Sequence, residues 1–264
     1  MPVTLDLQSR ATEGATVEQV GPGHWRLSIS PGPGSRYGVA QLDDYMSLPR
    51  AAFHWRPPLS LSLRARVSHH ALPGTWGCGF WNDPFAMSLG LREVARRLMV
   101  PPNAAWFFHA SAPNYLALRD DHPAQGLLAA TFSSIKIPGL LTLLGAPFLP
   151  LLLWPRGARA LRRMARHMVH EYAAEVAADP TEWHRYRLEW HSGSVRFFLD
   201  GQPCGETPVA PRGPLGLVLW IDNQYAAFPP TGALRFATLP VPEPAWLEVA
   251  EVELREPGTR KWPA

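Results

Sequence analysis

Three residues of this 264-residue chain combine a side chain suited to acid–base chemistry with aromatic or amide neighbours that favour a functional role. Asp83 lies in FWNDPF, Asp222 in LWIDNQY and His109 in AAWFFHA. A carboxyl group whose pKa is raised beside indole rings exchanges a proton near neutral pH. These three are therefore the candidate catalytic residues if the protein is an enzyme. The alternative is that acids at strand ends, Asp43 and Asp44 included, hydrogen-bond the backbone of turns.

The same segments hold the residue types of a saccharide-binding groove. Apolar faces of sugars stack on indole rings, whereas sugar hydroxyls need planar amide and carboxylate partners. Strand alternation requires some members of such a set to face the core instead. The candidate ligand-binding residues are Trp81, Asn82, Asp83, Trp106, His109, Trp220, Asp222, Asn223 and Gln224.

The elements that must position these side chains are predicted to be β-strands. Tyr186, Leu188 and Trp190 alternate with polar residues, as in a strand with one buried face. Ser192-Gly193 and Asp200-Gly201 are turn sequences on either side of a second short strand. The pattern therefore predicts consecutive antiparallel strands in this part of the chain.

The segment TWGCGFW, residues 75–81, is predicted to be a glycine-rich strand. Alternation places Trp76, Cys78 and Phe80 on one face and Trp81 on the other. Glycines in a strand allow close approach of another group. That group is either a neighbouring part of the protein or a bound ligand.

The motif W-H-x-Y-x-L-E-W from Trp183, followed by V-x-F-x-x-D-G-x-P from Val195, resembles the concanavalin A-like lectin/glucanase superfamily and, within it, glycoside hydrolase family 16. The resemblance implies an all-β fold, a jelly-roll β-sandwich of two antiparallel sheets. It also implies a strand with Glu, Asp and Glu at alternate positions, because a retaining mechanism needs two carboxyl groups about 5 Å apart. The strand expected there, AAWFFHA at 104–110, has no carboxylate.

We expect one jelly-roll domain over residues 1–264 with an insertion at 135–178. Residues 137–154 form an uncharged apolar run, but the strands on both sides belong to one sandwich, which excludes a single membrane crossing. An amphipathic helix is predicted next, with apolar Leu161, Met164, Ala165, Met168, Tyr172 and Val176 opposite an arginine-rich face. The apolar run is expected to form a lid over the sheet, a re-entrant or interfacial membrane loop, or an oligomer contact. The helix is expected either to dock on the sandwich with a solvated basic face or to rest on anionic lipid. The residues of the lid or membrane-contact surface are Leu140, Leu143, Phe148, Leu151, Trp154, Arg159, Arg162, Arg163 and Arg166.

The composition of the chain indicates which classes of partner are expected. The net charge of +3 and the concentration of basic residues in one local run argue against nucleic-acid binding.

Cys78 and Cys204 are predicted to be structural thiols, although a single disulfide between them is also compatible with the sequence. The N-terminus lacks the pattern of a signal peptide, so a cytoplasmic location, with possible membrane association, is expected. No cofactor is expected, and His167, His170 and Glu171 do not follow the HExxH order of a zinc site.

Three function classes follow from these observations. The first is a non-catalytic jelly-roll protein that takes a saccharide or a hydrophobic small molecule in an aromatic-lined groove on the concave sheet. The second is an enzyme, a glycosidase-like hydrolase or a lyase or isomerase, with relocated acid–base residues. The third is a peripheral membrane or protein-interaction module. The carboxylate-free strand favours the first class.

Overall fold

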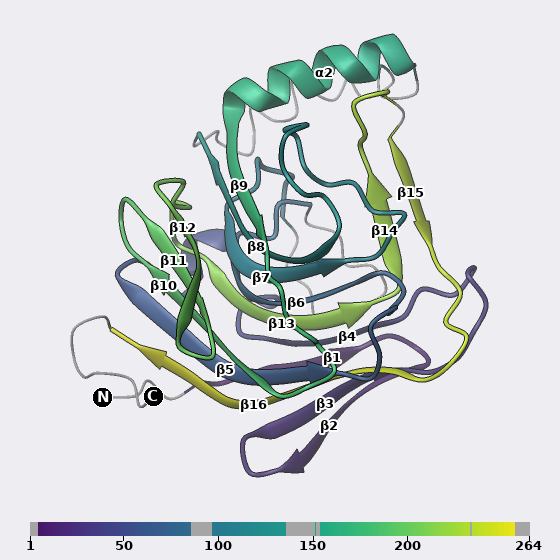
Figure 1. The fold of residues 1–264 in the computed structure, drawn as a ribbon, viewed down its shortest axis with the longest axis vertical. Helices are drawn as coiled ribbons and strands as arrows, with labels where there is room; N and C mark the ends of the chain where they lie inside the picture. The colour runs from purple at the N-terminus through teal and green to yellow at the C-terminus, as the bar shows by residue number, and fades with distance from the viewer. Residues whose placement is uncertain (1–4, 86–96, 136–150, 152–153, 233, 257–264) are drawn as a thin grey trace.

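Two antiparallel β-sheets packed face to face make up most of the structure (Figure 1). The computed structural model describes residues 5–85, 97–135, 151, 154–232 and 234–256. Within these ranges each sheet has seven strands, and the arrangement is the predicted jelly-roll sandwich. The first sheet, sheet A, contains, in spatial order, β1 (Gln8–Ala11), β4 (Val39–Asp43), β13 (Gly216–Asp222), β6 (Thr75–Trp81), β7 (Ala104–Ala110), β8 (Gly126–Ser134) and β9 (Val169–Glu175).

The second sheet, sheet B, covers one face of sheet A. Its strands, in spatial order, are β12 (Gln202–Thr207), β11 (Val195–Leu199), β10 (His184–Trp190), β5 (Leu59–Val67), β16 (Ala245–Arg255), β3 (His24–Ile29) and β2 (Ala15–Gly21). A separate hairpin is formed by β14 (Gln224–Ala227) and β15 (Arg235–Thr238). The short 3₁₀ helix η1 (Arg50–Ala52) and the helix α2 (Pro155–Met168) complete the described elements.

The core lies between the two sheets and confirms the predicted alternation. Trp76, Cys78 and Phe80 of β6 point into it, together with Tyr186 and Trp190 of β10. Burial of each large apolar side chain contributes on the order of 1.5 to 3 kcal/mol. The predicted turns are also present. Asp200 and Gly201 both have positive φ, 50° and 80°, as a tight hairpin turn requires.

The predicted helical stripe is wrong beyond Met168. The helix α2 ends there, and Val169–Glu175 is a strand, β9, that pairs with β8. Positions 168, 172 and 176 are four residues apart, a spacing that fits both the 3.6-residue period of a helix and the two-residue period of a strand. Tyr172 and Val176 therefore lie toward sheet B as alternate residues of an extended chain, not on a helix face.

The inner face of α2 is also different from the prediction, because an arginine lies at its centre. Arg162 is 3% exposed, and its guanidinium donates to the carbonyl oxygens of Ala117 (2.8 Å) and Phe228 (2.5 Å) and to Asp120 (2.9 Å). A buried guanidinium is tolerated when its donors find acceptors in this way. Arg162 thus attaches α2 to the loop before β8 and to the end of β14.

Replacing Arg162 by methionine is expected to lower the free energy of unfolding by about 2 to 4 kcal/mol, because carbonyl groups and Asp120 lose their buried partner. The matched control is Arg163→Met, since Arg163 is an exposed neighbour without an ion-pair partner among the described residues. That substitution is expected to change stability by less than about 0.5 kcal/mol. Urea denaturation of the two variants measures the difference, and equal effects would contradict the anchoring role.

Candidate functional site

Five aromatic rings gather on the face of sheet A that points away from sheet B, and we call this surface the aromatic face. Trp106 of β7 is at the centre, with ring centroids 5.8 Å from Trp81, 5.4 Å from Trp220, 5.4 Å from Phe108 and 6.3 Å from Phe132. The strand pairings β13–β6–β7–β8 place all five on adjacent strands. Aromatic pairs at these separations attract one another beyond simple area burial.

The glycines of β6 make this arrangement possible. A Cβ at Gly77 would lie 2.6 Å from the indole ring of Trp220, and a Cβ at Gly79 would lie 2.6 Å from Trp106 Cα. Both indole-bearing strands therefore approach β6 as closely as a bare backbone allows. Of the two alternatives for these glycines, the structure shows close packing by protein groups.

Part of the aromatic face is open. Phe108 and Trp220 are buried, at 6% and 8% exposure, whereas Trp81, Trp106 and Phe132 are half-buried. The Trp106 Nε1–H is buried and has no hydrogen-bond partner among the residues that the structure describes. Leaving such a donor unpaired is unfavourable, so this indole has capacity for an acceptor. Trp81, Trp106 and Trp220, all three predicted from the sequence, are thus brought together.

Asp222 lies at one end of the aromatic face in a short hydrogen-bonded chain. Trp220 Nε1 donates to Thr75 Oγ1 (2.9 Å), and Thr75 Oγ1 donates to Asp222 Oδ1 (2.9 Å). The backbone N–H groups of Thr75 and Gln224 donate to the same oxygen. Burial raises the pKa of the Asp222 carboxyl to about 7, against the lowering effect of these donors. Asp222 is therefore partly protonated at neutral pH.

Asp83 lies at the other end of β6. Asp222 pairs with Thr75 at the start of that strand, and Asp83 follows Trp81 at its end. Six residue steps of about 3.3 Å separate the strand ends by about 20 Å. The Asp83 carboxylate forms a buried ion pair with Arg97. The two acids are therefore too far apart for either a retaining or an inverting glycosidase pair.

His109 lies on the opposite face of sheet A from Trp106. Its ring stacks on Trp76 with centroids 5.7 Å apart, and Trp76 belongs to the core between the sheets. Burial lowers the pKa of His109 to about 4, so the imidazole is neutral at physiological pH. Of the three candidate catalytic residues, the structure thus brings no two together.

The amide side chains of the candidate set are occupied by backbone groups. Asn82 Nδ2 donates to Pro101 O, and Asn82 Oδ1 accepts from Asn103 N, both at 2.9 Å. Asn223 Oδ1 accepts from Gly38 N, and its Nδ2 donates to two carbonyl oxygens. Gln224 is half-buried and starts β14, beyond the aromatic face.

Asp43 and Asp44 fit the turn interpretation. Asp43 accepts from the backbone N–H groups of Tyr45 and Met46, and Asp44 accepts from Leu217 N and Trp55 Nε1. Burial raises the pKa of Asp44 to about 6. Neither acid extends the aromatic face with a free carboxylate.

Two residues of the aromatic face are absent from the sequence-based candidates. Phe108 follows Trp106 by two positions, so strand alternation alone was enough to find it. Phe132 lies on β8, and its place depends on the pairing of Ala104 with Phe132 across the sheet. The sequence around Phe132 alone does not indicate which residue of β7 it pairs with.

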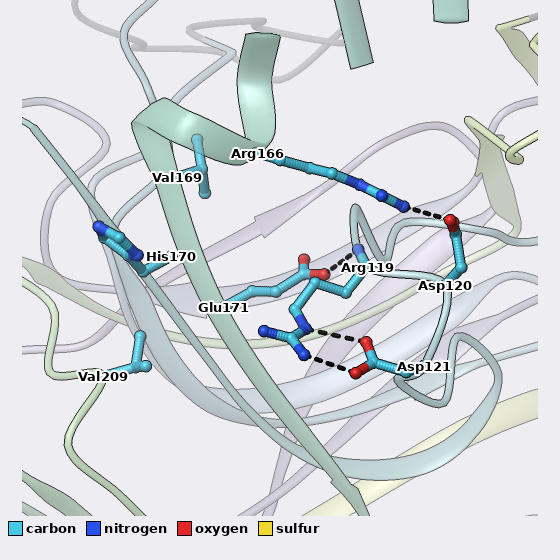
Figure 2. Close-up of a pocket in the computed structure, with 8 residues that line it drawn as sticks. All are labelled: Arg119, Asp120, Asp121, Arg166, Val169, His170, Glu171 and Val209. Atoms are coloured by element: carbon cyan, nitrogen blue, oxygen red, sulfur yellow. Dashed lines mark hydrogen bonds and ion pairs between the residues drawn. The ribbon is translucent and has the colours of Figure 1, made fainter. Parts of the chain in front are cut away.

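A hollow of about 500 Å³ lies beside the junction of α2 and β9 (Figure 2). Its charged groups bind one another: Asp121 pairs with Arg119, and Asp120 pairs with Arg166. Glu171 accepts the backbone N–H groups of Leu118 and Arg119. The lining residues are Arg119, Asp120, Asp121, Arg166, Val169, His170, Glu171 and Val209. The carboxylates of this hollow therefore hold the loop before β8 in place.

The predicted lid or membrane surface is only partly within the described residues. Leu140, Leu143 and Phe148 lie outside them. Leu151 and Trp154 are exposed, at 37% and 53%. Arg159 and Arg163 are exposed on α2, whereas Arg166 is ion-paired with Asp120 and Arg162 is buried. Within the described ranges no helix has the length and apolar character needed to cross a bilayer.

The two cysteines are free thiols. Cys78 is in the core, where burial raises its pKa to about 12, and Cys204 is half-buried beside the core with a pKa of about 11. Thiols with raised pKa values are poor nucleophiles, as expected of structural residues.

Fold and site together define an antiparallel jelly-roll protein with an aromatic face on one sheet. No family model matches the chain, and no curated protein matches it. Solved structures with a similar fold include the Bacillus licheniformis β-glucanase, at 12% identity over 90% of this chain and 81% of that chain with a TM-score of 0.45. They also include a prokaryotic β-1,3-1,4-glucanase (lichenase) from a mouse hindgut metagenome, at 12% identity over 91% and 83% with a TM-score of 0.46. The κ-carrageenase of Pseudoalteromonas carrageenovora, in complex with an oligotetrasaccharide of κ-carrageenan, is 11% identical over 92% and 82%, with a TM-score of 0.49.

Proposed function

We propose that the protein binds an apolar small molecule on the aromatic face and catalyses no reaction there. The observation that carries this proposal is the contact of five aromatic rings across four adjacent strands. Three of the rings are half-buried, which leaves part of each available to a ligand. Rigid aromatic surfaces of this kind bind apolar molecules with little loss of side-chain entropy.

The described residues of this face include no acid–base pair, which supports the non-catalytic part of the proposal. Strand β7 presents Ala104, Trp106, Phe108 and Ala110 to the aromatic face, and none of them ionises. The nearest acid with a raised pKa, Asp222, uses one carboxylate oxygen for three donors. Among the described residues of this face, the Asp222 carboxyl group has no second acid or base to work with.

Most of the amide and carboxylate side chains of the candidate binding set are already bound to protein groups, which favours an apolar ligand over a saccharide. Sugar hydroxyls need free amide or carboxylate partners, whereas Asn82, Asn223 and Asp83 are bound to protein groups. An apolar ligand makes no such demand. A saccharide is the second candidate, because the unpaired Trp106 Nε1–H is a donor beside a stacking surface.

The test is a comparison of two tryptophan variants, one on each sheet. All-trans-retinol is the apolar probe, followed by its own fluorescence, and laminaritetraose is the saccharide probe, followed by calorimetry. Trp106→Ala is expected to weaken retinol binding at least about tenfold, because a stacking surface worth about 1.4 kcal/mol or more is lost. The matched control is Trp183→Ala, which removes another half-buried indole, on the outer side of sheet B, and should leave binding unchanged.

The variant Trp106→Phe separates the two ligand classes. It keeps an aromatic ring but removes the Nε1 donor, so binding of an apolar probe should persist. Loss of tetrasaccharide binding in that variant, with no retinol binding by the wild type, would favour the saccharide. Hydrolysis of lichenan that disappears in Asp222→Asn would overturn the non-catalytic assignment.

A further inference from the structure

The outer face of α2 carries arginines without carboxylate partners. Arg156, Arg159 and Arg163 are exposed, and no ion pair joins them to an acid of the described residues. Within the described ranges, Arg159 Nε donates to the carbonyl oxygen of Pro155, at 3.3 Å, and to no carboxylate. Among the arginines on the inner side, Arg162 and Arg166 both pair with Asp120. The helix therefore has a neutralised inner side and a cationic outer side.

Exposed apolar side chains border this cationic strip. Trp154, directly before the helix, is 53% exposed, and Met164 is 54% exposed. The tip of the β14–β15 hairpin lies beside the first turn of α2, since a Cβ on Gly232 would be 3.0 Å from Arg159 Cγ. Figure 1 shows this hairpin tip at the N-terminal end of α2, at one extremity of the molecule.

The β14–β15 hairpin also carries an exposed aromatic side chain and an exposed arginine. Phe236 is 51% exposed, and its neighbour Arg235 is exposed with no carboxylate partner among the described residues. Exposed apolar side chains that gather within one region rimmed by charged residues mark an interaction surface, whereas a single exposed ring does not. We define the α2 surface as Trp154, Arg156, Arg159, Arg163, Arg235 and Phe236.

We propose that the α2 surface docks on an anionic lipid bilayer. Arginines at a membrane surface attract acidic headgroups, with a contribution of about 1 kcal/mol each, and Trp and Phe favour the boundary between headgroups and acyl chains. A polyanion such as RNA would satisfy the arginines and could stack its bases on Trp154 and Phe236, but it offers no acyl-chain layer for Met164. The bilayer surface is the partner that satisfies both kinds of side chain. Docking here does not depend on a ligand at the aromatic face.

The experiment is co-sedimentation of the full chain with phosphatidylcholine vesicles that contain or lack phosphatidylglycerol. Arg156→Gln/Arg163→Gln is expected to lower the partition coefficient on the anionic vesicles by about 30-fold, from two lost contributions of about 1 kcal/mol. The matched control is Arg56→Gln/Arg212→Gln, which removes two exposed arginines far from α2 in the sequence that have no carboxylate partner in the described part of the chain. That variant should bind nearly as the wild type does.

A second pair of measurements tests the apolar part. Trp154→Ala/Phe236→Ala should also release the protein, while about 1 M salt, which shortens the screening length to about 3 Å, should release the wild type. Equal binding to neutral vesicles, equal loss in both arginine doubles, or retention by RNA without retention by vesicles would each overturn the proposal. Unchanged retinol binding in these variants would show that the ligand site is separate, and far-UV circular dichroism confirms that each variant is folded.

Discussion

Replacement of Gly79 by alanine is expected to remove about 3 to 5 kcal/mol from the free energy of unfolding. The new Cβ would lie 2.6 Å from both Cα and Cβ of Trp106 and would clash with the Ala105 carbonyl oxygen. The Ala105 oxygen and Trp106 Cα are backbone atoms of the paired strand β7, which cannot move without breaking the ladder. Gly79 also has φ of 154°, a conformation that L-residues rarely adopt. Overpacking and backbone strain each contribute on the order of 1 to 3 kcal/mol.

Because domains of this kind have about 5 to 15 kcal/mol of total stability, the variant should unfold at a much lower denaturant concentration. Urea denaturation followed by tryptophan fluorescence measures the shift. The matched control is Gly193→Ala, since a Cβ at that turn residue meets nothing within 4 Å. If both variants unfolded at the wild-type midpoint, β6 and β7 would not be packed as closely as the structure places them.

Asp222→Asn is expected to stabilise the protein at alkaline pH and to have little effect at acidic pH. The asparagine Oδ1 accepts the hydrogen bonds of Thr75 and Gln224 as the carboxyl does. The pKa of Asp222 is raised to about 7 by burial, whereas an unfolded Asp titrates near 3.9. The folded state therefore binds the extra proton, and its stability falls as the pH rises through this interval.

A shift of this size corresponds to about 3 to 4 kcal/mol between pH of about 4 and pH above about 7. Wild type and variant should have the same free energy of unfolding below pH of about 4. Above pH of about 7 the variant should be more stable by about 3 to 4 kcal/mol. The control is Asp179→Asn, an exposed acid whose pKa is lowered by hydrogen bonds from Thr181. That substitution removes a favourable carboxylate, so it should give no gain at high pH. A pH-independent difference for Asp222→Asn would show that its carboxyl is not buried as described.

Much of the fold was predictable because strand faces and turns are local properties. Alternation of Tyr186, Leu188 and Trp190 and the turn at Asp200-Gly201 identify their strands without knowledge of the neighbours. The end of α2 was not predictable from spacing, because residues four apart match a helix and a strand equally. Pairing with β8 decides that Val169–Glu175 is extended.

Some features of the aromatic face were also predictable from local sequence, whereas others depend on the tertiary structure. Trp106 and Phe108 share a face of β7, and His109, three residues from Trp106, must point to the other face; the sequence by itself determines both facts. The tertiary structure alone decides that Trp81, Trp220 and Phe132 surround Trp106 and that Asp83 and Asp222 lie at opposite ends of β6. Side-chain direction along a strand is encoded within a few residues. Strand order and register instead depend on how distant segments bury their apolar faces together.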